Sequence, residues 1–344
     1  MAESGVGGHT TGLGSASRYS PVIASLPAKE GIRKKVTYRA GGDGFLQVEY
    51  GEKQEFDLWD AFRLFTVIEH LERRKADGIL EMSQGFRTLT VRYSPALIGY
   101  ASLIEELKQA EESVGSVEEM SFRSRRIEIP IAFDDPAIAK SIDYYSQFVR
   151  KDAPNVINHN NIEYTAMYNG ITVDEVKSKL LGSGWLLVHQ LFFPGGTYQL
   201  PIDPRSAMEA PKYNPTRTQT PEGAVGLGGQ CMYIYTVESP GGYQMLGRAA
   251  PTYQLSQRHP DFKERPFLLS ASDEIRYVET SPEKLQDIYN AVHADASPSF
   301  RFRIEEKRFS VRDYSEFISR EDVKEERARF NRLKEGAQKR VLLP

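Results

Sequence analysis

The chain has 344 residues, of which 40% are hydrophobic and 26% charged, and its formal net charge is -3. This composition is ordinary for a globular protein large enough for two modest domains, and the small net charge gives no reason to expect nucleic acid as a partner. No apolar run approaches the roughly 18 residues of a spanning helix, so no membrane partner is expected. The N-terminus lacks a secretory signal, and Cys231 is the single cysteine, so no internal disulfide forms. We therefore expect a cytoplasmic protein.

The first third of the sequence predicts a small α+β sandwich subdomain over 36–124. Residues 1–35 before it are rich in Gly, Ser, Ala and Thr and are predicted to be a disordered tail. Apolar spacing then predicts two strands, a helix, a strand and a helix, over 36–39, 45–50, 57–75, 88–93 and 97–114. The order ββαβα in about 90 residues is typical of a small α+β sandwich.

Residues 125–280 predict a second, β-rich domain. A helix begins at Pro136, and a further short helix is capped by Thr172 with Glu175 in the capping-box position. Short strands punctuated by Gly and Pro are predicted over 185–193, 225–227, 231–237, 243–248 and 274–278. Several short strands with few helices favour a closed, barrel-like domain.

The last segment, 281–344, is predicted to be a charged helical extension. A helix over 281–293 has Ser281 as cap and Pro282 in its first position, and residues 313–340 are charged and helical in pattern. Two interpretations remain open here, a solvated terminal helix and a docking arm for a partner.

Two Gly-Gly pairs, at 228–229 and 241–242, flank the apolar run 231–237. They are either two tight hairpin turns or the walls of a backbone-lined pocket for an anion or carbonyl group. If the strand over 243–248 pairs antiparallel with 231–237, four polar side chains converge on one concavity at the mouth of the barrel. These are Arg217, Gln230, Gln244 and Arg248.

Motifs of self-contained catalysis are absent from the sequence. It has no phosphate-cradling P-loop, no nucleophile elbow and no ligand-spaced pair among its six histidines, so no metal site is predicted. No residue is assigned as general base, and the catalytic residues stay unknown at this level.

A set of motifs in fixed order carries a family resemblance. They are Asp203-Pro204-Arg205, Lys212-Tyr213-Asn214-Pro215, Arg217-Thr218, the run 220–229 (TPEGAVGLGG), the run 239–248 (SPGGYQMLGR), 266–269 (PFLL) and 273–277 (DEIRY). With them the chain resembles the KipI-like, or allophanate hydrolase subunit 1, family. It is most similar to the C-terminal half, subdomains C and D, of the carboxyltransferase domain of urea carboxylase (urea amidolyase). The likeness is firm over 125–280, fainter over 36–122, and extends to the segment 300–335.

The resemblance implies a small α+β subdomain followed by a cyclophilin-like β-barrel. It also implies transfer of a carboxyl group from carboxybiotin to an amide-like nitrogen, such as that of urea. Such a reaction needs donors for the biotin ureido oxygen and groups that hold the carboxylate and the acceptor. The substrate-binding residues implied are Tyr213, Asn214, Arg217, Thr218, Gly228, Gly229, Gln230, Gly241, Gly242, Tyr243, Gln244 and Arg248.

The resemblance further implies that other chains take part. The sequence shows no KipA-like half, no ATP-grasp region and no Ala-Met-Lys-Met carrier segment. We therefore expect no covalently bound cofactor, and carboxybiotin presented by a partner, either a KipA-like subunit or a biotin carrier protein. Bacterial KipI-like subunits work in a heteromeric, ATP-dependent amidohydrolase, 5-oxoprolinase. Three hypotheses follow: a carboxyltransferase or amidohydrolase subunit with a small-molecule substrate, a non-catalytic regulatory binding module, and a stand-alone enzyme redirected to another small molecule.

Overall fold

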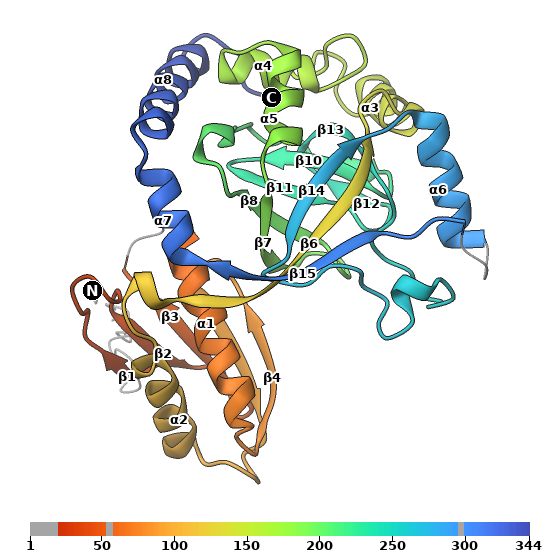
Figure 1. Ribbon diagram of the computed structural model, residues 1–344. Helices are drawn as coiled ribbons and strands as arrows, with labels where there is room; N and C mark the ends of the chain where they lie inside the picture. Colours follow the sequence, from red (N-terminus) through yellow and green to blue (C-terminus); the bar gives the residue numbers. More distant parts are fainter. Residues whose placement is uncertain (1–19, 53–57, 295–298) are drawn as a thin grey trace, which may run out of the picture.

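The computed structural model describes residues 20–52, 58–294 and 299–344, which form a small sheet subdomain and a barrel (Figure 1). The small subdomain has an antiparallel sheet in the order β1-β2-β3-β5-β4, with helices α1 and α2 packed together in front of it. Its strands are β1 (Val22–Leu26), β2 (Val36–Ala40), β3 (Phe45–Tyr50), β4 (Ile79–Gln84) and β5 (Thr88–Tyr93). Its helices are α1 (Leu58–Arg74), α2 (Tyr100–Glu112) and the short 3-10 turn η1 (Val117–Glu119).

Strand β1 corrects the prediction of a disordered tail over 1–35. It pairs antiparallel with β2, with Leu26 opposite Val36. The prediction rested on the average composition of residues 1–35 and therefore missed this short apolar run. The run forms a strand beside β2. Residues 1–19 of the predicted tail lie outside the described residues.

The second part is a seven-stranded mixed barrel. Its strands follow the order β13-β10-β11-β8-β7-β14-β6, and a pairing between β13 and β6 closes the circle. The β14–β6 pair is parallel, and the other pairs of the barrel are antiparallel. The barrel strands are β6 (Ser121–Ala132), β7 (Trp185–Gln190), β8 (Thr197–Pro201), β10 (Ala224–Gly228), β11 (Cys231–Ile234), β13 (Gln244–Ala249) and β14 (Glu274–Glu279). The predicted α+β class, with a small subdomain followed by a β-barrel, is confirmed.

Shorter elements surround the barrel. Strands β9 (Arg217–Thr220) and β12 (Ser239–Gly241) form a separate two-stranded sheet. The helices are α3 (Pro136–Phe148), α4 (Ile162–Asn169), α5 (Val173–Gly182) and α6 (Pro282–Ala294), with the 3-10 turns η2 (Pro204–Ser206) and η3 (Pro260–Phe262). Asp135 caps α3 by accepting a hydrogen bond from the amide of Ala137, and Thr172 caps α5 in the predicted capping box.

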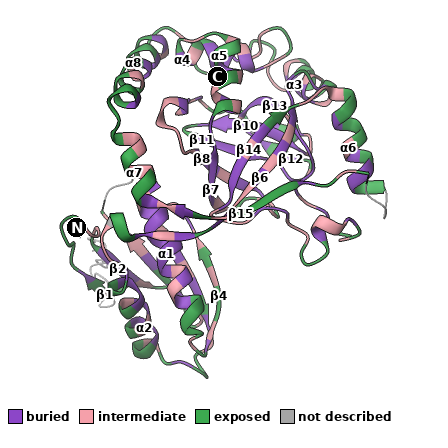
Figure 2. Cartoon of the chain, in the orientation of Figure 1, coloured by how far each residue is buried: buried purple, intermediate pink, exposed green. Residues whose placement is uncertain are grey.

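Each part has its own apolar core, seen as buried residues along α1 and inside the barrel (Figure 2). In the small subdomain, Phe62 of α1 stacks against Phe122 of β6 and contacts Phe309, with ring centroids 5.8 and 5.1 Å away. In the barrel, Ile127 and Ile129 of the same strand β6 are fully buried. Strand β6 therefore contributes to both cores.

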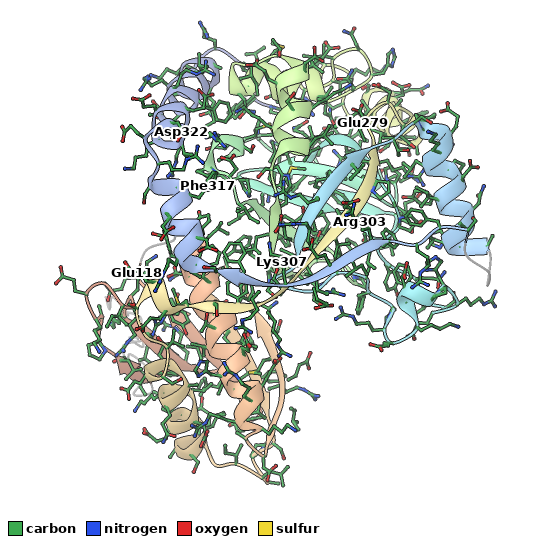
Figure 3. The ribbon with its side chains drawn as sticks, in the orientation of Figure 1. Glu118, Glu279, Arg303, Lys307, Phe317 and Asp322 are labelled. Carbon is green, nitrogen blue, oxygen red and sulfur yellow. The ribbon has the colours of Figure 1, made fainter. Side chains whose placement is uncertain are left out.

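The C-terminal segment is docked on both parts of the molecule. Strand β15 (Arg303–Ser310) pairs with β6 from Ser121 to Glu128. Helix α7 (Val311–Ser319) brings Tyr314 within 5.0 Å of the Phe62 ring in the small subdomain. Helix α8 (Glu321–Gln338) packs on α4, and its Lys334 pairs with Glu209 at 2.7 Å. Lys307, Phe317 and Asp322 mark the course of this segment in Figure 3. The predicted charged extension is thus part of the folded body.

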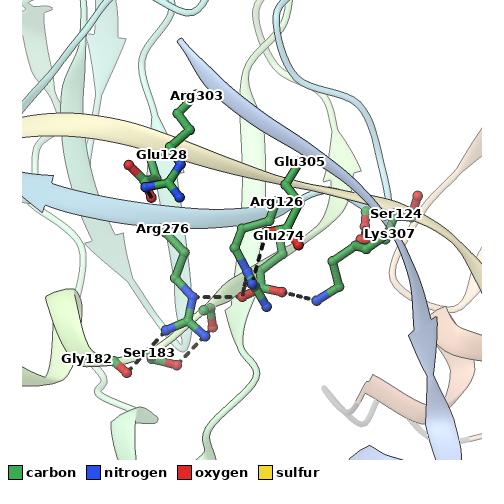
Figure 4. Close-up of polar contacts among 12 residues, drawn as sticks. Ser124, Arg126, Glu128, Gly182, Ser183, Glu274, Arg276, Arg303, Glu305 and Lys307 are labelled. Carbon is green, nitrogen blue, oxygen red and sulfur yellow. Dashed lines mark hydrogen bonds and ion pairs between the residues drawn. The ribbon is translucent and has the colours of Figure 1, made fainter.

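A buried carboxylate fixes β15 and β14 to β6 (Figure 4). Glu274 of β14 is 2% exposed and pairs with Arg126 at 3.2 Å, with Arg276 at 2.7 Å and with Lys307. Burial alone would raise the pKa of Glu274, but the hydrogen bonds and charges of Lys307 and Arg276 outweigh it and lower that pKa. Gly184 makes room for the carboxylate, because a Cβ there would lie 2.7 Å from its Oε1.

The Glu274→Gln substitution should lower the free energy of unfolding by about 2 kcal/mol at pH 7, since it leaves partly exposed cations around a neutral amide. Because the folded-state pKa of Glu274 is lowered, its contribution is present above its ordinary value of 4.5 and is lost as the pH falls through the lowered pKa. Urea unfolding of both proteins from pH 3 to 7 checks this. Glu305→Gln, at a side chain 61% exposed, is the matched control and should change little. A Glu274→Gln loss that does not shrink in acid would contradict the account.

Candidate functional site

The residues predicted to bind substrate lie in three separate places in the structure. Gly228, Gly229 and Gln230 form the turn between β10 and β11. A second group surrounds the buried side chain of Arg217 and consists of Tyr213, Gly241, Gly242, Tyr243 and Gln244. Arg248 lies near the other end of β13 from Gln244 and lines a cavity.

The two Gly-Gly pairs serve close packing. A Cβ on Gly228 would lie 2.2 Å from the Tyr243 ring, and one on Gly241 would lie 2.6 Å from the Tyr235 ring. Gly229 has φ +58°, and its amide donates to the carbonyl of Ala210 at 2.7 Å. That amide is therefore occupied within the protein, and the turn does not offer it to a bound oxyanion.

Arg217 is held by neutral groups. Its side chain is fully buried, Nη1 donates to the carbonyl of Tyr243 at 2.7 Å, and Nε and Nη2 donate to Oγ1 of Thr220 at 3.3 and 3.2 Å. The guanidinium also lies 4.4 Å from the ring centroid of Tyr213, a cation–π contact. Burial raises the pKa of Tyr213, although the Arg217 cation opposes this shift.

The neighbouring amides complete this network. Asn161 Oδ1 accepts from the Tyr213 hydroxyl at 2.8 Å and from the amide of Met245 at 3.0 Å. Gln244 is fully buried, donates to the carbonyl of Pro211 at 2.7 Å, and accepts from Nδ2 of Asn155 at 3.0 Å. Such mutually satisfied bonds mark a structural network. Binding roles for Tyr213, Arg217 and Gln244 stay predictions.

The other predicted residues are exposed. Asn214 precedes Pro215 through a cis peptide bond, and Thr218 points to solvent on β9. Gln230 is exposed as well, and its Nε2 donates to Glu209 at 3.3 Å.

The predicted convergence of Arg217, Gln230, Gln244 and Arg248 on one concavity is wrong, because β13 does not pair with β11. It pairs antiparallel with β10, placing Arg248 opposite Ala224 at one end of β10, whereas Gln230 follows the other end. Four residue steps along a strand cover roughly 13 Å, so these two side chains lie at opposite ends of the barrel. The apolar run is also shorter than predicted: β11 ends at Ile234, and β12 intervenes before β13.

Arg248 lines a cavity of about 620 Å³ between the start of α3, the end of α6 and the loop 253–256. Its Nε donates to the carbonyl of Glu222 at 2.9 Å, and its Nη1 lies 3.6 Å from the Asp135 carboxylate. The guanidinium packs 3.8 Å from the ring centroid of Tyr289. These contacts fix the side chain. A preorganised guanidinium beside a cavity is suited to bind a carboxylate.

The same cavity holds an acid–base pair. His293 Nε2 lies 2.9 Å from Glu222 Oε1, with side chains 38% and 27% exposed. The hydrogen bond that His293 donates to the Glu222 carboxylate raises the pKa of His293, while burial and the Arg248 cation oppose that shift. Histidine is the side chain whose ordinary pKa lies closest to physiological pH, so it is the usual group for proton exchange there. This pair makes the cavity, referred to below as the Arg248 pocket, the candidate functional site.

Sequence reasoning missed three residues of this pocket, Asp135, Glu222 and His293. Glu222 and His293 are 71 positions apart. No spacing rule connects them, and only the packing of α6 against β13 brings them together. Asp135 directly precedes the helix start predicted at Pro136, and its approach to Arg248 depends on the β13–β6 pairing.

The described part of the chain lacks three other features: a cluster of metal ligands, a reactive cysteine and a membrane-spanning helix. No group of three or more His, Cys, Asp or Glu side chains there could hold a metal ion. Burial raises the pKa of the Cys231 thiol to about 12, which makes it inert at neutral pH. No helix among these residues is long and apolar enough to cross a membrane.

Comparisons with known proteins agree with the fold. The profile of the carboxyltransferase domain, subdomain C and D, matches residues 36–263. Urea amidolyase of Lachancea kluyveri is 34% identical over 87% of this chain, which spans only 16% of that protein. The crystal structure of the K. lactis urea amidolyase superposes with a TM-score of 0.77 at 30% identity, over 94% of this chain and 19% of that one. One of the 5-oxoprolinase subunits of Bacillus subtilis is 25% identical over 70% of this chain and 91% of its own length.

Replacing Arg217 by alanine should lower the free energy of unfolding by about 3 kcal/mol, because the change leaves a cavity and unpaired oxygens in a buried network. Chemical denaturation provides the measurement. The matched control is Thr218→Ala, an exposed neighbour on the same strand, which should change stability by less than about 0.5 kcal/mol. Equal stability of Arg217→Ala and the parent protein would show that Arg217 is not a structural anchor.

His293 should titrate above the ordinary value of 6.5, and Glu222→Gln should lower its pKa because the hydrogen bond that His293 donates to the Glu222 carboxylate causes the shift. NMR titration of the imidazole resonances measures this. Because the folded-state pKa is raised, stability from the pair is complete below pH 6.5 and is lost as the pH rises through the raised value. Glu238→Gln, at an exposed carboxylate on the rim of the same pocket, is the control and should leave the titration unchanged.

Proposed function

Because the chain belongs to the family of carboxyltransferase domains, subdomains C and D, we propose that it forms part of a carboxyltransferase- or amidohydrolase-type enzyme for a urea- or amide-like small molecule. The observation that carries this proposal is the position of the Arg248 guanidinium in the structure. It ends the motif at 239–248, and its guanidinium lines a cavity beside the Glu222–His293 pair. In this view the Arg248 pocket is the reaction site.

Arg248 binds the carboxyl group in this proposal. Asp135, the Glu222 carbonyl and the Tyr289 ring hold the guanidinium in place at the wall of the cavity. Since the guanidinium is fixed before the ligand arrives, little ordering entropy is lost on binding. Carboxybiotin, presented by a biotin carrier protein, would supply the carboxyl group.

The Glu222–His293 pair moves the proton. Attack of an amide-like nitrogen on the carboxyl carbon would form an N–C bond and break the C–N bond to the biotin ureido nitrogen, which would leave with the bonding electron pair. The attacking nitrogen must lose a proton. Neutral His293 accepts that proton, the Glu222 carboxylate stabilises the imidazolium that results, and the imidazolium would return the proton to the departing ureido nitrogen. The Glu222 carboxylate raises the pKa of His293, which favours uptake of the proton.

A partner chain completes the enzyme in this proposal. The chain resembles one subunit of a bacterial 5-oxoprolinase and a small part of a much longer urea amidolyase. We therefore propose a KipA-like subunit or a biotin carrier protein as its partner.

A transfer assay tests the function. Radiolabelled carboxyl groups on a carboxylated biotin carrier protein are followed after addition of urea or a small amide, with this chain and a KipA-like subunit present. Arg248→Ala should lower kcat/KM by about 10- to 100-fold, the effect of losing a charged hydrogen bond worth about 1.5–3 kcal/mol. Arg312→Ala, an exposed arginine on α7, is the matched control and should keep full activity.

Transfer that is unchanged in a folded Arg248→Ala protein would remove the Arg248 pocket as the site. Binding of a small amide without any transfer, in the presence of both partners, would instead indicate a regulatory binding module. Thermal melting of each variant separates these results from loss of folding.

A further inference from the structure

A second, larger cavity lies where the two parts of the molecule meet. Its volume is about 840 Å³, within the range of ligand sites. One wall is the last half of α1 with β4, and the other is the loop 265–273 of the barrel domain. It shares no lining residue with the Arg248 pocket, so the proposed reaction does not account for it.

The cavity runs along an open sheet edge. Strand β4 is the last strand of its sheet and pairs only with β5 among the described residues. The four consecutive residues Ile79, Leu80, Glu81 and Met82 all line the cavity. A β-bulge between Ile79 and Glu81 interrupts the regular alternation of side chains, which lets neighbouring residues of β4 line the same cavity. The free edge of β4 borders this groove, which we call the β4 groove.

The open edge has a defined end. The carbonyl of Gln84 accepts a hydrogen bond from Nδ1 of His189, on β7 of the barrel. Burial lowers the pKa of His189, so the ring is neutral and carries its proton on Nδ1 toward that carbonyl. The edge is thus closed at Gln84, and the amide of Ile79 donates to the carbonyl of Ala76 at 3.3 Å, so the open part of the edge is residues 80–83.

Apolar side chains line the groove beside this edge. Ile68 of α1 and Met82 of β4 are partly buried next to Phe65, whereas Leu80 is 52% exposed. An extended chain laid on β4 would cover Leu80 and place alternate side chains against the apolar wall.

The charges of the β4 groove are unequally compensated. Glu69 pairs with Arg308 at 2.9 Å, Glu72 pairs with Arg123, and Asp273 pairs with Arg125. Arg265 and Lys75, by contrast, have side chains without a hydrogen bond or ion pair to any residue that the structure describes. The same holds for the carboxylate of Glu306, so the groove has two unpaired cations and one unpaired carboxylate among the described residues.

Arg265 lies in an unfavourable electrostatic position. Desolvation lowers its pKa, and the nearby Arg125 cation lowers it further, although part of the side chain remains exposed. A carboxylate placed against Arg265 would offset both effects.

We propose that the β4 groove binds an extended acidic peptide segment of a partner protein, which adds as a strand to β4 and places a carboxylate on Arg265. Backbone bonds to the open edge supply affinity, and the free cations select an acidic sequence. The site is independent of the proposed reaction.

A phage-displayed library of random peptides of about eight residues, the length of a strand, provides the probe. It is selected on the full chain and, in parallel, on Arg265→Ala and on the matched control Arg312→Ala. The parent and Arg312→Ala proteins should enrich peptides with Asp or Glu, and Arg265→Ala should not. Synthetic copies should bind Arg265→Ala at least about tenfold more weakly, the effect of one charged hydrogen bond.

Hydrogen exchange locates the bound peptide. The amides of residues 80–83 that do not already bond to β5 should exchange more slowly in the complex, because a new strand pairs with them, whereas amides near the Arg248 pocket should not change. Failure to enrich any peptide on the parent protein over Arg265→Ala would overturn the proposal. So would peptides that bind without protecting β4.

Discussion

Strand β6 belongs to both parts of the molecule, and its pairings determine where the candidate site lies. Its first residues enter the core of the small subdomain through Phe122, and its last residues enter the barrel core through Ile129 and Ile131. Strand β13 closes the barrel by pairing at the end of β6, with Arg248 opposite Ala132. Asp135, which caps α3, follows only three positions later. The closure of the barrel therefore places Arg248 beside the carboxylate that helps to hold it.

The family motifs of this chain contain residues that are needed for packing as well as residues that are candidates for binding. Gly228 and Gly241 are glycines because the rings of Tyr243 and Tyr235 occupy the space of a side chain there. Arg217 is a cation stabilised by a carbonyl, a hydroxyl and an aromatic ring, deep inside the protein. A buried charge of this kind is strongly constrained, since any smaller or uncharged side chain leaves its partners unsatisfied. Of the motif residues considered as binding groups, Arg248 is the one that combines a fixed position with access to a cavity.

The sequence predicted local elements well and long-range pairings poorly. The helix expected over 57–75 is α1, Leu58–Arg74, because its apolar spacing is a property of the helix itself. The error over β13 arose from the assumption that neighbouring strands pair. Residues 239–241 leave the barrel to pair with β9, so β13 returns beside β10 instead. The barrel as a whole was predictable through the family resemblance, whereas the Glu222–His293 pair joins two distant segments and left no local signal.

The docked C-terminal segment has a consequence for the order in which the chain folds. Arg308 of β15 bonds to Ser121 of β6, 187 positions earlier, and Phe309 stacks on Phe122 with ring centroids 5.1 Å apart. The small subdomain comes early in the chain, yet Phe309 of its aromatic core is 187 positions after Phe122. During synthesis this subdomain must remain incomplete, with Phe62 and Phe122 not covered by Phe309 and Tyr314, until β15 and α7 have left the ribosome. Contacts of such long sequence separation slow folding and prolong exposure of apolar surface, so the nascent chain depends on late closure by its own C-terminal segment.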